Sequence, residues 1–426
     1  MDFLFYHSAA PEIPAHFRGK KIWLPANEYA PALIRHILAG KKEHANVLVE
    51  ENLAQFFPAQ TEFRCTIVKN GTASSRTSKK IVLYAQSDTL ANSVAVMAEH
   101  LNDHQLFFSV PGRAAERADI FFRSHNIPFG PYSFKWLKKV RPDVLLLLND
   151  WSKEPQRIIA HCRWLGIPVI CLQESVIDFG DRFRRMLWAD HVLVQGAQTV
   201  RDLDRETYFV TGNPRYENIP PAGERGNEAL INCNFTYGIF EDQRYGWLDD
   251  IHDTLAAEGL DYAISQHPRD TGDLKKYNKV LPSSSARVHG QLENAAFLVT
   301  RFSSLIHEAL VMGVPVIYYN PHGETMQYDF GFNGRFIFLA TTREELRDAV
   351  QRLRSVQWSP EELEEYLAIH CLPRHPVPSA NIDHLLAFHH FRPGSFGIAD
   401  LLKLVLYYPH IKTLLSRLRK IVMKAG

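Results

Sequence analysis

The feature that most constrains the fold is an alternation of short buried-strand runs with longer helix-like segments, which occurs twice along the chain. Such alternation is typical of a parallel sheet with helices on both faces. Pro214, Pro220 and Pro221 interrupt the first series, and a second series of the same kind follows. We therefore expect an α/β protein with two doubly wound sheets. The expected strands lie at 81–85, 142–148, 167–172, 189–195 and 208–212, and then at 229–232, 261–265, 297–300 and 314–319.

The alternation also divides the chain. With 426 residues and 46% hydrophobic content, the chain has apolar material for more than one core. We expect an N-terminal extension over 1–79, which ends in a polar stretch typical of a loop. Two Rossmann-like domains follow, over 80–220 and 221–355, and face each other across a cleft. Residues 356–426 are expected to form a helical C-terminal tail.

Charge and cysteine content exclude several classes of protein. The chain has 48 basic and 47 acidic residues, so no overall positive field favours a nucleic-acid partner. It lacks a positive leader at its start, and its apolar runs are far shorter than the roughly 20 residues that span a bilayer. Its cysteines are odd in number and lack CxxC spacing, which favours a reducing compartment. We therefore predict a cytoplasmic protein. The cysteines are Cys65, Cys162, Cys171, Cys233 and Cys371.

A basic segment closes the chain, between residues 398 and 424. Its basic residues are interleaved with leucines, and no acidic residue follows Asp400. Such a segment is suited to lie on an anionic membrane surface, and it is equally suited to pack on the protein with a solvated basic face. We predict that it tethers the protein peripherally to the inner membrane. The basic residues are Lys403, Lys412, Arg417, Arg419, Lys420 and Lys424.

The sharpest chemical signal is a Ser-Ser turn within residues 298–318, between an expected strand and an expected helix. Ser303 and Ser304 would lie at the helix N-terminus, where hydroxyls, unpaired N–H groups and the positive dipole end can hold a pyrophosphate. Serine is also a good N-cap without any ligand, which is the structural alternative.

The residues around this turn carry a resemblance. Residues 300–304, with Pro315, Tyr328 and Gly331 downstream, resemble the nucleotide-binding segment of the CDP-glycerol glycerophosphotransferase and capsular polysaccharide transferase superfamily. The resemblance extends over about residues 140–350. It implies a GT-B-type fold, with the donor in the C-terminal domain and the acceptor in the N-terminal domain. Arg301 stands where the superfamily has Asp.

A second match completes the expected donor site. Residues 264–270 resemble the His-Pro motif at the end of the second strand of the C-terminal domain, a motif shared with bacterial polysialyltransferases. There His267 can donate to a phosphate or protonate a leaving group, and Arg269 can hold a phosphate bidentately. A loop histidine beside a turn proline is the alternative. The predicted donor and phosphate ligands are Arg269, Arg301, Ser303, Ser304 and Glu308, with His267 as a catalytic residue.

The N-terminal domain supplies candidate carboxylates. Residues 166–175 and 209–216 resemble elements of these transferases and of UDP-GlcNAc 2-epimerases. Glu174 is the first choice for the base that deprotonates an acceptor hydroxyl, with Asp150 as a second catalytic candidate. The residues expected to line the cleft are Asp178, Asn213 and Arg215.

Metal and cofactor sites are not predicted. Asp202 and Asp204 have DxD spacing but lie in a charged stretch, and His370, Cys371 and His375 lack a fourth ligand. Neither GxGxxG nor GxxxxGK[ST] occurs. The expected ligands are therefore substrates: a nucleotide-activated sugar or polyol as donor, and a glycan or lipid-linked glycan as acceptor.

The resemblance thus implies a metal-independent transferase of surface-polysaccharide assembly. One alternative is a UDP-GlcNAc 2-epimerase-like sugar-nucleotide epimerase. Those epimerases have a His-Arg-containing motif after the first strand of the second domain, where residues 231–238 of this chain contain neither His nor Arg. Another alternative is a non-catalytic polysaccharide assembly or export factor, which is motivated by Arg301 and Asn320 at positions where the superfamily has acidic residues.

Overall fold

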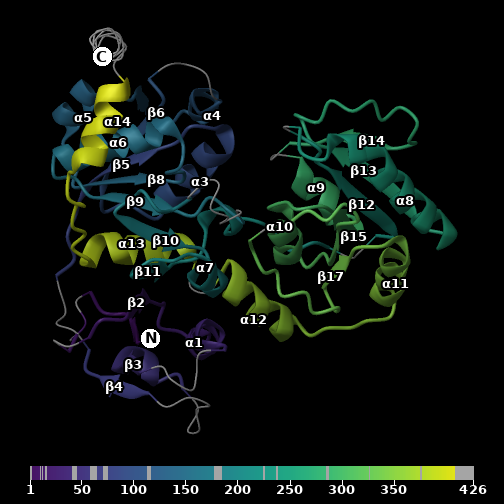
Figure 1. The fold of residues 1–426 in the computed structure, drawn as a ribbon, viewed down its shortest axis with the longest axis horizontal. Coiled ribbons are helices and arrows are strands. Elements are labelled where there is room, and N and C mark those ends of the chain that lie inside the picture. Colours follow the sequence, from purple (N-terminus) through teal and green to yellow (C-terminus); the bar gives the residue numbers. More distant parts are fainter. Residues whose placement is uncertain are drawn as a thin grey trace, which may run out of the picture.

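A computed structural model shows two sheet-centred units (Figure 1). The first unit combines the purple, blue and teal segments with the yellow helices near the end of the chain, and the second unit is green. The structure describes residues 2–9, 11, 13–14, 17–40, 46–57, 65–70, 75–112, 117–176, 185–223, 226–236, 238–284, 287–325, 327–374 and 377–407.

The first sheet has eleven strands among the described residues, and each pair of neighbours is parallel. Their order is β4-β3-β1-β2-β11-β10-β9-β8-β5-β6-β7. The 1–79 segment therefore builds four edge-side strands of this sheet, joined to the rest where β2 pairs with β11. The strands are β1 (Phe3–Tyr6), β2 (Lys20–Trp23), β3 (Val47–Glu50), β4 (Thr66–Val68), β5 (Lys80–Tyr84), β6 (Gln105–Val110), β7 (Phe129–Pro131), β8 (Val144–Leu147), β9 (Val169–Leu172), β10 (His191–Val194) and β11 (Thr207–Val210).

The second sheet has six described strands in the order β14-β13-β12-β15-β16-β17, again with parallel neighbours. The chain runs outward from β12 through β13 to β14, and then returns to the other side of β12 with β15. The crevice beyond the carboxyl ends of β12 and β15 is therefore a topological switch point, where such sheets bind ligands. The strands are β12 (Glu228–Cys233), β13 (Asp261–Gln266), β14 (Val280–Pro282), β15 (Ala295–Thr300), β16 (Val316–Tyr319) and β17 (Ile337–Ala340).

Helices cover both faces of each sheet, so the strands are buried apolar runs. In β8, Val144 and Leu146 pack into one core and Leu145 and Leu147 into the other. This arrangement confirms the predicted α/β class with two doubly wound sheets. The helices are α1 (Ala30–Leu38), α2 (Glu51–Ala54), α3 (Asp88–Ala98), α4 (Ala118–Ser124), α5 (Phe134–Val140), α6 (Lys153–Trp164), α7 (Ala197–Asp202), α8 (Arg244–Ala257), α9 (Val288–Glu293), α10 (Leu305–Val311), α11 (Arg343–Leu353), α12 (Pro360–His370), α13 (Pro378–Phe388) and α14 (Ile398–Tyr407), with 3-10 turns η1 (Pro214–Tyr216) and η2 (Glu241–Gln243).

The chain returns from the second unit to the first through α12 and α13. It crosses the ends of β10 and β11 at Gly196 and Gly212. A Cβ at Gly212 would lie 2.4 Å from the carbonyl oxygen of Leu372, and one at Gly196 would lie 2.3 Å from that of Ile369. Both crossings therefore require glycine, and at Gly212 the positive φ of 83° adds to the requirement.

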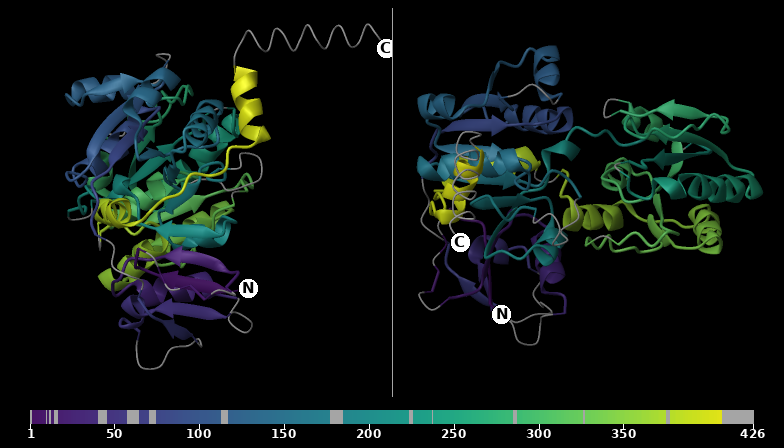
Figure 2. Two further views of the ribbon diagram at one scale, coloured as in Figure 1. Left: turned by 90° about the vertical axis from the view of Figure 1, so that its left-hand side faces the viewer. Right: turned by 45° about the horizontal axis from the view of Figure 1, so that its top comes forward.

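The described part of the predicted C-terminal tail contains three helices. Helix α12 contributes Tyr366 and Leu367 to the core of the second unit, whereas α13 and α14 pack on the first unit. Helix α13 contributes Ile382, Leu385 and Leu386 to one face of the first sheet, and α14 contacts α6 (Figure 2). The basic residues beyond Lys403 lie outside the described residues. Of the helices that the structure describes, none combines the length and apolar character that a membrane span requires.

Candidate functional site

An ion pair joins the two units beside the switch point of the second sheet. Arg215, in η1 just after β11, donates from Nε to Glu308 Oε1 at 3.0 Å. Glu308 belongs to α10 of the second unit, and its other oxygen accepts from His289 Nε2 at 2.7 Å. Burial alone would raise the pKa of Glu308, but Arg215 and His289 outweigh it and lower the pKa to about 2. Glu308 is therefore a buried carboxylate that is anionic at neutral pH.

Asn213 fixes the position of Arg215 relative to Glu174, the predicted base. The Asn213 side chain is fully buried, and its amide donates to the carbonyl oxygens of Gln173 at 2.9 Å and Glu174 at 3.1 Å. Its Oδ1 accepts from the Arg215 N–H at 3.1 Å. One side chain thus ties the loop after β9 to the turn after β11. Asn213 acts through its neighbours, because its polar atoms are used inside the protein.

Glu174 is a half-buried carboxylate at the end of β9. In the described part of the chain no hydrogen bond reaches its carboxylate oxygens. Burial raises its pKa, and the positive charges of Arg215 and Arg185 oppose that rise. A carboxylate with a raised pKa and free oxygens has the properties of a general base.

Asp150 follows β8, and its carboxylate is used to brace a loop. Its oxygens accept from the backbone N–H groups of Met186 at 2.7 Å, Trp188 at 2.8 Å and Ala189 at 3.0 Å. Because these bonds occupy both oxygens, Asp150 is poorly placed to act as a base. Asp178 lies outside the described residues.

The predicted His-Pro turn follows β13 and is folded against the loop after β12. The His267 N–H donates to the Cys233 carbonyl at 2.8 Å, and His267 Nδ1 accepts from the Arg269 N–H at 3.2 Å. Burial lowers the pKa of His267, although Asp270 opposes this effect. A neutral ring whose Nδ1 accepts has its proton on Nε2, so Nε2 is a donor. The Arg269 side chain is exposed beside it.

Arg301 is buried, and its charge is already paired. It forms an ion pair with Glu324, donates to the Ile239 carbonyl at 3.2 Å, and lies 4.9 Å from the Phe235 ring centre. Asn320 fixes Glu324 in turn, since Asn320 Oδ1 accepts from the Glu324 N–H at 2.7 Å. Arg301 and Asn320, the two positions that depart from the superfamily pattern, thus contact the same residue, Glu324. In this structure the Arg301 guanidinium links Glu324 to the loop after β12, and it is not free to bind a phosphate.

The Ser-Ser turn lies at the start of α10. Ser303 Oγ accepts from the Leu305 N–H at 3.2 Å, and Ser304 is the N-cap residue without a side-chain capping bond to the described residues. Both serines are partly exposed, and α10 carries Glu308 one turn further on. The Ser-Ser turn and the paired carboxylate are therefore held on one helix.

Sequence reasoning missed several residues of this region. Glu324 and His289 belong to no recognised motif, and their roles follow only from contacts with Arg301 and Glu308. His307 is fully buried between the units, where its Nδ1 lies 3.5 Å from Gln195 Nε2. Burial lowers its pKa to about 3, so it is neutral. No sequence signal separated it from the other histidines.

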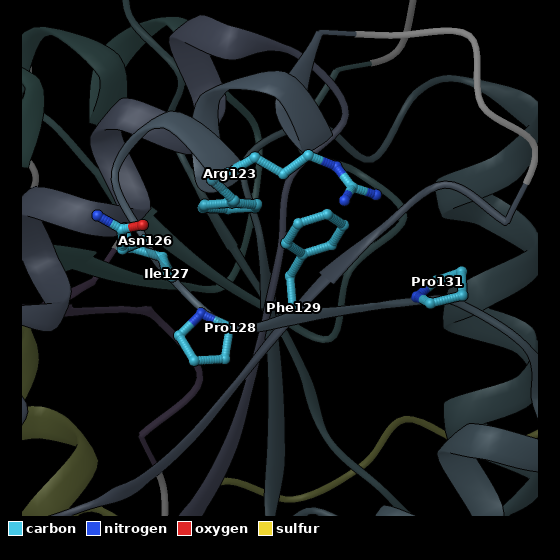
Figure 3. Close-up of a pocket in the computed structure, with 7 residues that line it drawn as sticks. Arg123, Asn126, Ile127, Pro128, Phe129 and Pro131 are labelled. Carbon is cyan, nitrogen blue, oxygen red and sulfur yellow. The ribbon is translucent and has the colours of Figure 1, made fainter.

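A pocket of about 370 Å³ lies away from these residues, beside α4 and the edge strand β7. Figure 3 shows Arg123 beside the Phe129 ring, with 5.2 Å between the guanidinium and the ring centre. Its lining contains no carboxylate and none of the predicted site residues. We therefore place the candidate site at the switch point of the second sheet, where the ion pair joins the two units, and not in this pocket.

Comparisons with known proteins agree on the fold. No family model and no curated protein matches the sequence. A putative UDP-N-acetylglucosamine 2-epimerase from Listeria monocytogenes matches with a TM-score of 0.53 and 13% identity, over 72% of this chain and 94% of that one. The UDP-GlcNAc 2-epimerase from Neisseria meningitidis bound to UDP-GlcNAc matches with 0.51 and 12%, over 72% and 99%. The glycotransferase of kitacinnamycin matches with 0.50 and 13%, over 73% and 98%.

These similarities establish a fold. Two parallel-sheet α/β units are shared with the transferase and with the epimerases, so the chain has a GT-B-type, Rossmann-like fold. At such low identity the similarity does not extend to particular side chains.

Proposed function

We propose that this chain binds a nucleotide-activated donor between its two units and transfers a glycosyl group, or a polyol-phosphate unit, to a surface-polysaccharide acceptor. The observation that carries the proposal is the buried anionic Glu308, which lies between Arg215 and His289 beside the switch point of the second sheet. A fixed carboxylate of this kind can accept hydrogen bonds from the hydroxyls of a bound nucleotide sugar once Arg215 moves toward the phosphates.

The donor phosphates would be met by hydrogen-bond donors on the second unit. His267 presents Nε2–H, Arg269 is an exposed residue with a cationic side chain, and the Ser303-Ser304 turn presents hydroxyls. These groups can stabilise negative charge on the leaving phosphate without a metal ion. Arg301 would act indirectly, because it links the loop after β12 to the loop after β16 through Ile239 and Glu324.

The acceptor would be activated from the first unit. Glu174 takes the proton of the acceptor hydroxyl, whose oxygen attacks the anomeric carbon, or the phosphorus of a polyol-phosphate donor. The bond to the leaving phosphate then breaks, and the nucleotide departs with the bonding electron pair. Asn213 positions both Glu174 and Arg215 for this step.

The structural neighbours support nucleotide-sugar chemistry in this fold. One is an epimerase bound to UDP-GlcNAc, and another is a spinosyn rhamnosyltransferase complexed with thymidine diphosphate, with a TM-score of 0.50 and 10% identity. The transfer to a surface polysaccharide rests on the superfamily resemblance of residues 140–350.

A second candidate is sugar-nucleotide epimerisation, which the epimerase neighbours favour. The loop after β12 contains Asn234 and Phe235, and no His or Arg lies within 231–238. Transfer is therefore preferred.

One experiment separates these possibilities. The full-length protein is incubated with nucleotide sugars and polyol nucleotides based on CMP, CDP, UDP and GDP, with and without capsular or teichoic acid-type glycans. Nucleotide release that requires the glycan supports transfer, and a new isomer formed without glycan supports epimerisation. A donor that binds without conversion supports an assembly factor and contradicts the proposal. Glu174→Gln is the matched control, since it should bind the donor but release little nucleotide.

A further inference from the structure

Helix α14 presents an apolar face to solvent. Ile398 is 79% exposed, Leu401 47% and Leu402 52%. Because residues three and four positions apart share one side of a helix, these side chains form a single stripe. Figure 2 shows α14 on the outside of the first unit.

The opposite side of α14 is anchored. Asp400 is buried and accepts from Arg163 Nη1 of α6 at 3.2 Å. The Lys403 ammonium lies 3.9 Å from the centre of the Trp188 ring. These contacts fix the rotation of α14 about its own axis. The apolar stripe therefore faces away from the first unit. Asp400 is the one acidic residue in the sequence from 398 to 426, and these contacts bury it.

Trp164 adds an exposed ring on α6, the helix that α14 packs against. It is the last residue of α6, it is 59% exposed, and its ring centre lies 5.0 Å from that of Phe396. Exposed apolar side chains elsewhere, such as Ile67, Ile120 and Leu339, lie on separate elements. Isolated exposed apolar residues are ordinary, whereas a contiguous stripe marks an interaction site.

The sequence beyond α14 indicates which partner the stripe fits. Residues 408–426 lie outside the described residues, but their sequence contains Lys412, Arg417, Arg419, Lys420 and Lys424 and no acidic residue. Cationic charge that follows an apolar stripe with a tryptophan matches the interface of an anionic phospholipid bilayer. We propose that Trp164 and the outer face of α14 insert into such a bilayer. This goes beyond the proposed function and does not depend on it.

The test is co-sedimentation of the full-length protein with vesicles of phosphatidylcholine alone or mixed with phosphatidylglycerol. The expected result is binding to the mixed vesicles, weakened by salt. The double variant Leu401→Glu/Leu402→Glu should bind more weakly by on the order of a hundredfold, since two apolar side chains are replaced by anions. The matched control Ile120→Glu changes an apolar residue on α4 that is more exposed than Leu401 or Leu402, and it should bind like wild type.

Three results would overturn the proposal. If wild type and the double variant bind the mixed vesicles equally, the stripe does not contact lipid. Binding to both vesicle types alike would remove the anionic preference. Self-association of wild type, lost in the double variant and without vesicle binding, would assign the stripe to a second copy of the chain. Nucleotide-induced changes in Tm are measured on the same proteins, so failure here leaves the proposed function separately testable.

Discussion

Replacing Arg215 by Met tests the ion pair between the two units. The change removes the positive charge beside Glu308 and keeps most of the side-chain volume. Lowering the pKa of a buried carboxyl from 4.5 to about 2 corresponds to about 3 kcal/mol, at 1.36 kcal/mol for each pH unit. Breaking a buried ion pair by removing one partner costs about 3–5 kcal/mol, which agrees. For a chain of 426 residues, whose unfolding entropy is about 0.9 kcal/mol/K, we therefore expect Arg215→Met to lower the Tm by roughly 3–6 °C.

The stabilisation from Glu308 should also depend on pH, in a direction that its lowered pKa determines. Because the pKa of Glu308 is lower in the folded protein than its ordinary value of 4.5, its stabilisation is fully present above about 4.5. It is lost as the pH falls toward about 2. The difference in Tm between wild type and Arg215→Met should therefore be constant near neutral pH and should narrow below about 4.5.

The assay is thermal unfolding followed by circular dichroism at a series of pH values. Arg343→Met is the matched control, because Arg343 pairs with Asp253 at 2.9 Å on the surface, where both side chains are half-exposed. That pair should contribute about 0–1 kcal/mol. A loss for Arg215→Met no larger than for Arg343→Met would refute the reasoning, as would a difference in Tm that does not narrow in acid.

Further predictions concern the residues of the proposed site. Glu174→Gln should lower turnover by about 10²–10⁴-fold with little change in donor affinity, as single-turnover and binding measurements would show, and weakened donor binding would contradict a role as base. His267→Ala and Arg269→Ala should each lower turnover by on the order of 10²-fold while unfolding stability changes by about half a kcal/mol. Near-normal turnover in both would remove them from the donor site. Arg301→Ala should instead lower the free energy of unfolding by about 3–5 kcal/mol, measured by urea denaturation, because it leaves a buried carboxylate unpaired. Unchanged stability with lost donor binding would restore Arg301 as a phosphate ligand.

The fold could be predicted because its signal is local. Strands such as β8 and β9 are continuous apolar runs, and each is followed by a segment of helical length, so the alternation is visible in the sequence. The membership of β2 in the first sheet could not be predicted in this way. It begins with Lys20 and Lys21, and its place is set by pairing with β11, far along the chain.

Residues of the candidate site could be proposed from the sequence only where they follow strands. Glu174 and His267 were proposed because ligands bind at the carboxyl ends of parallel strands. Their surroundings depend on contacts between distant positions, which no local pattern shows. Arg215 and Glu308 are separated by 93 positions, and Arg301 meets Glu324 from the next loop. A lone arginine in a motif therefore suggested a phosphate ligand, whereas its buried partner gives it a structural role.

Binding of a nucleotide-activated donor between the units is tested most directly by the Tm of the full-length protein with CMP, CDP, UDP and GDP, each added in large excess. A nucleotide that binds only the folded state adds about 2.7 kcal/mol at a hundredfold excess over Kd. At least one of the four should raise the Tm of wild type, and Glu308→Gln should respond less. A Tm unchanged by every nucleotide would contradict donor binding at this site.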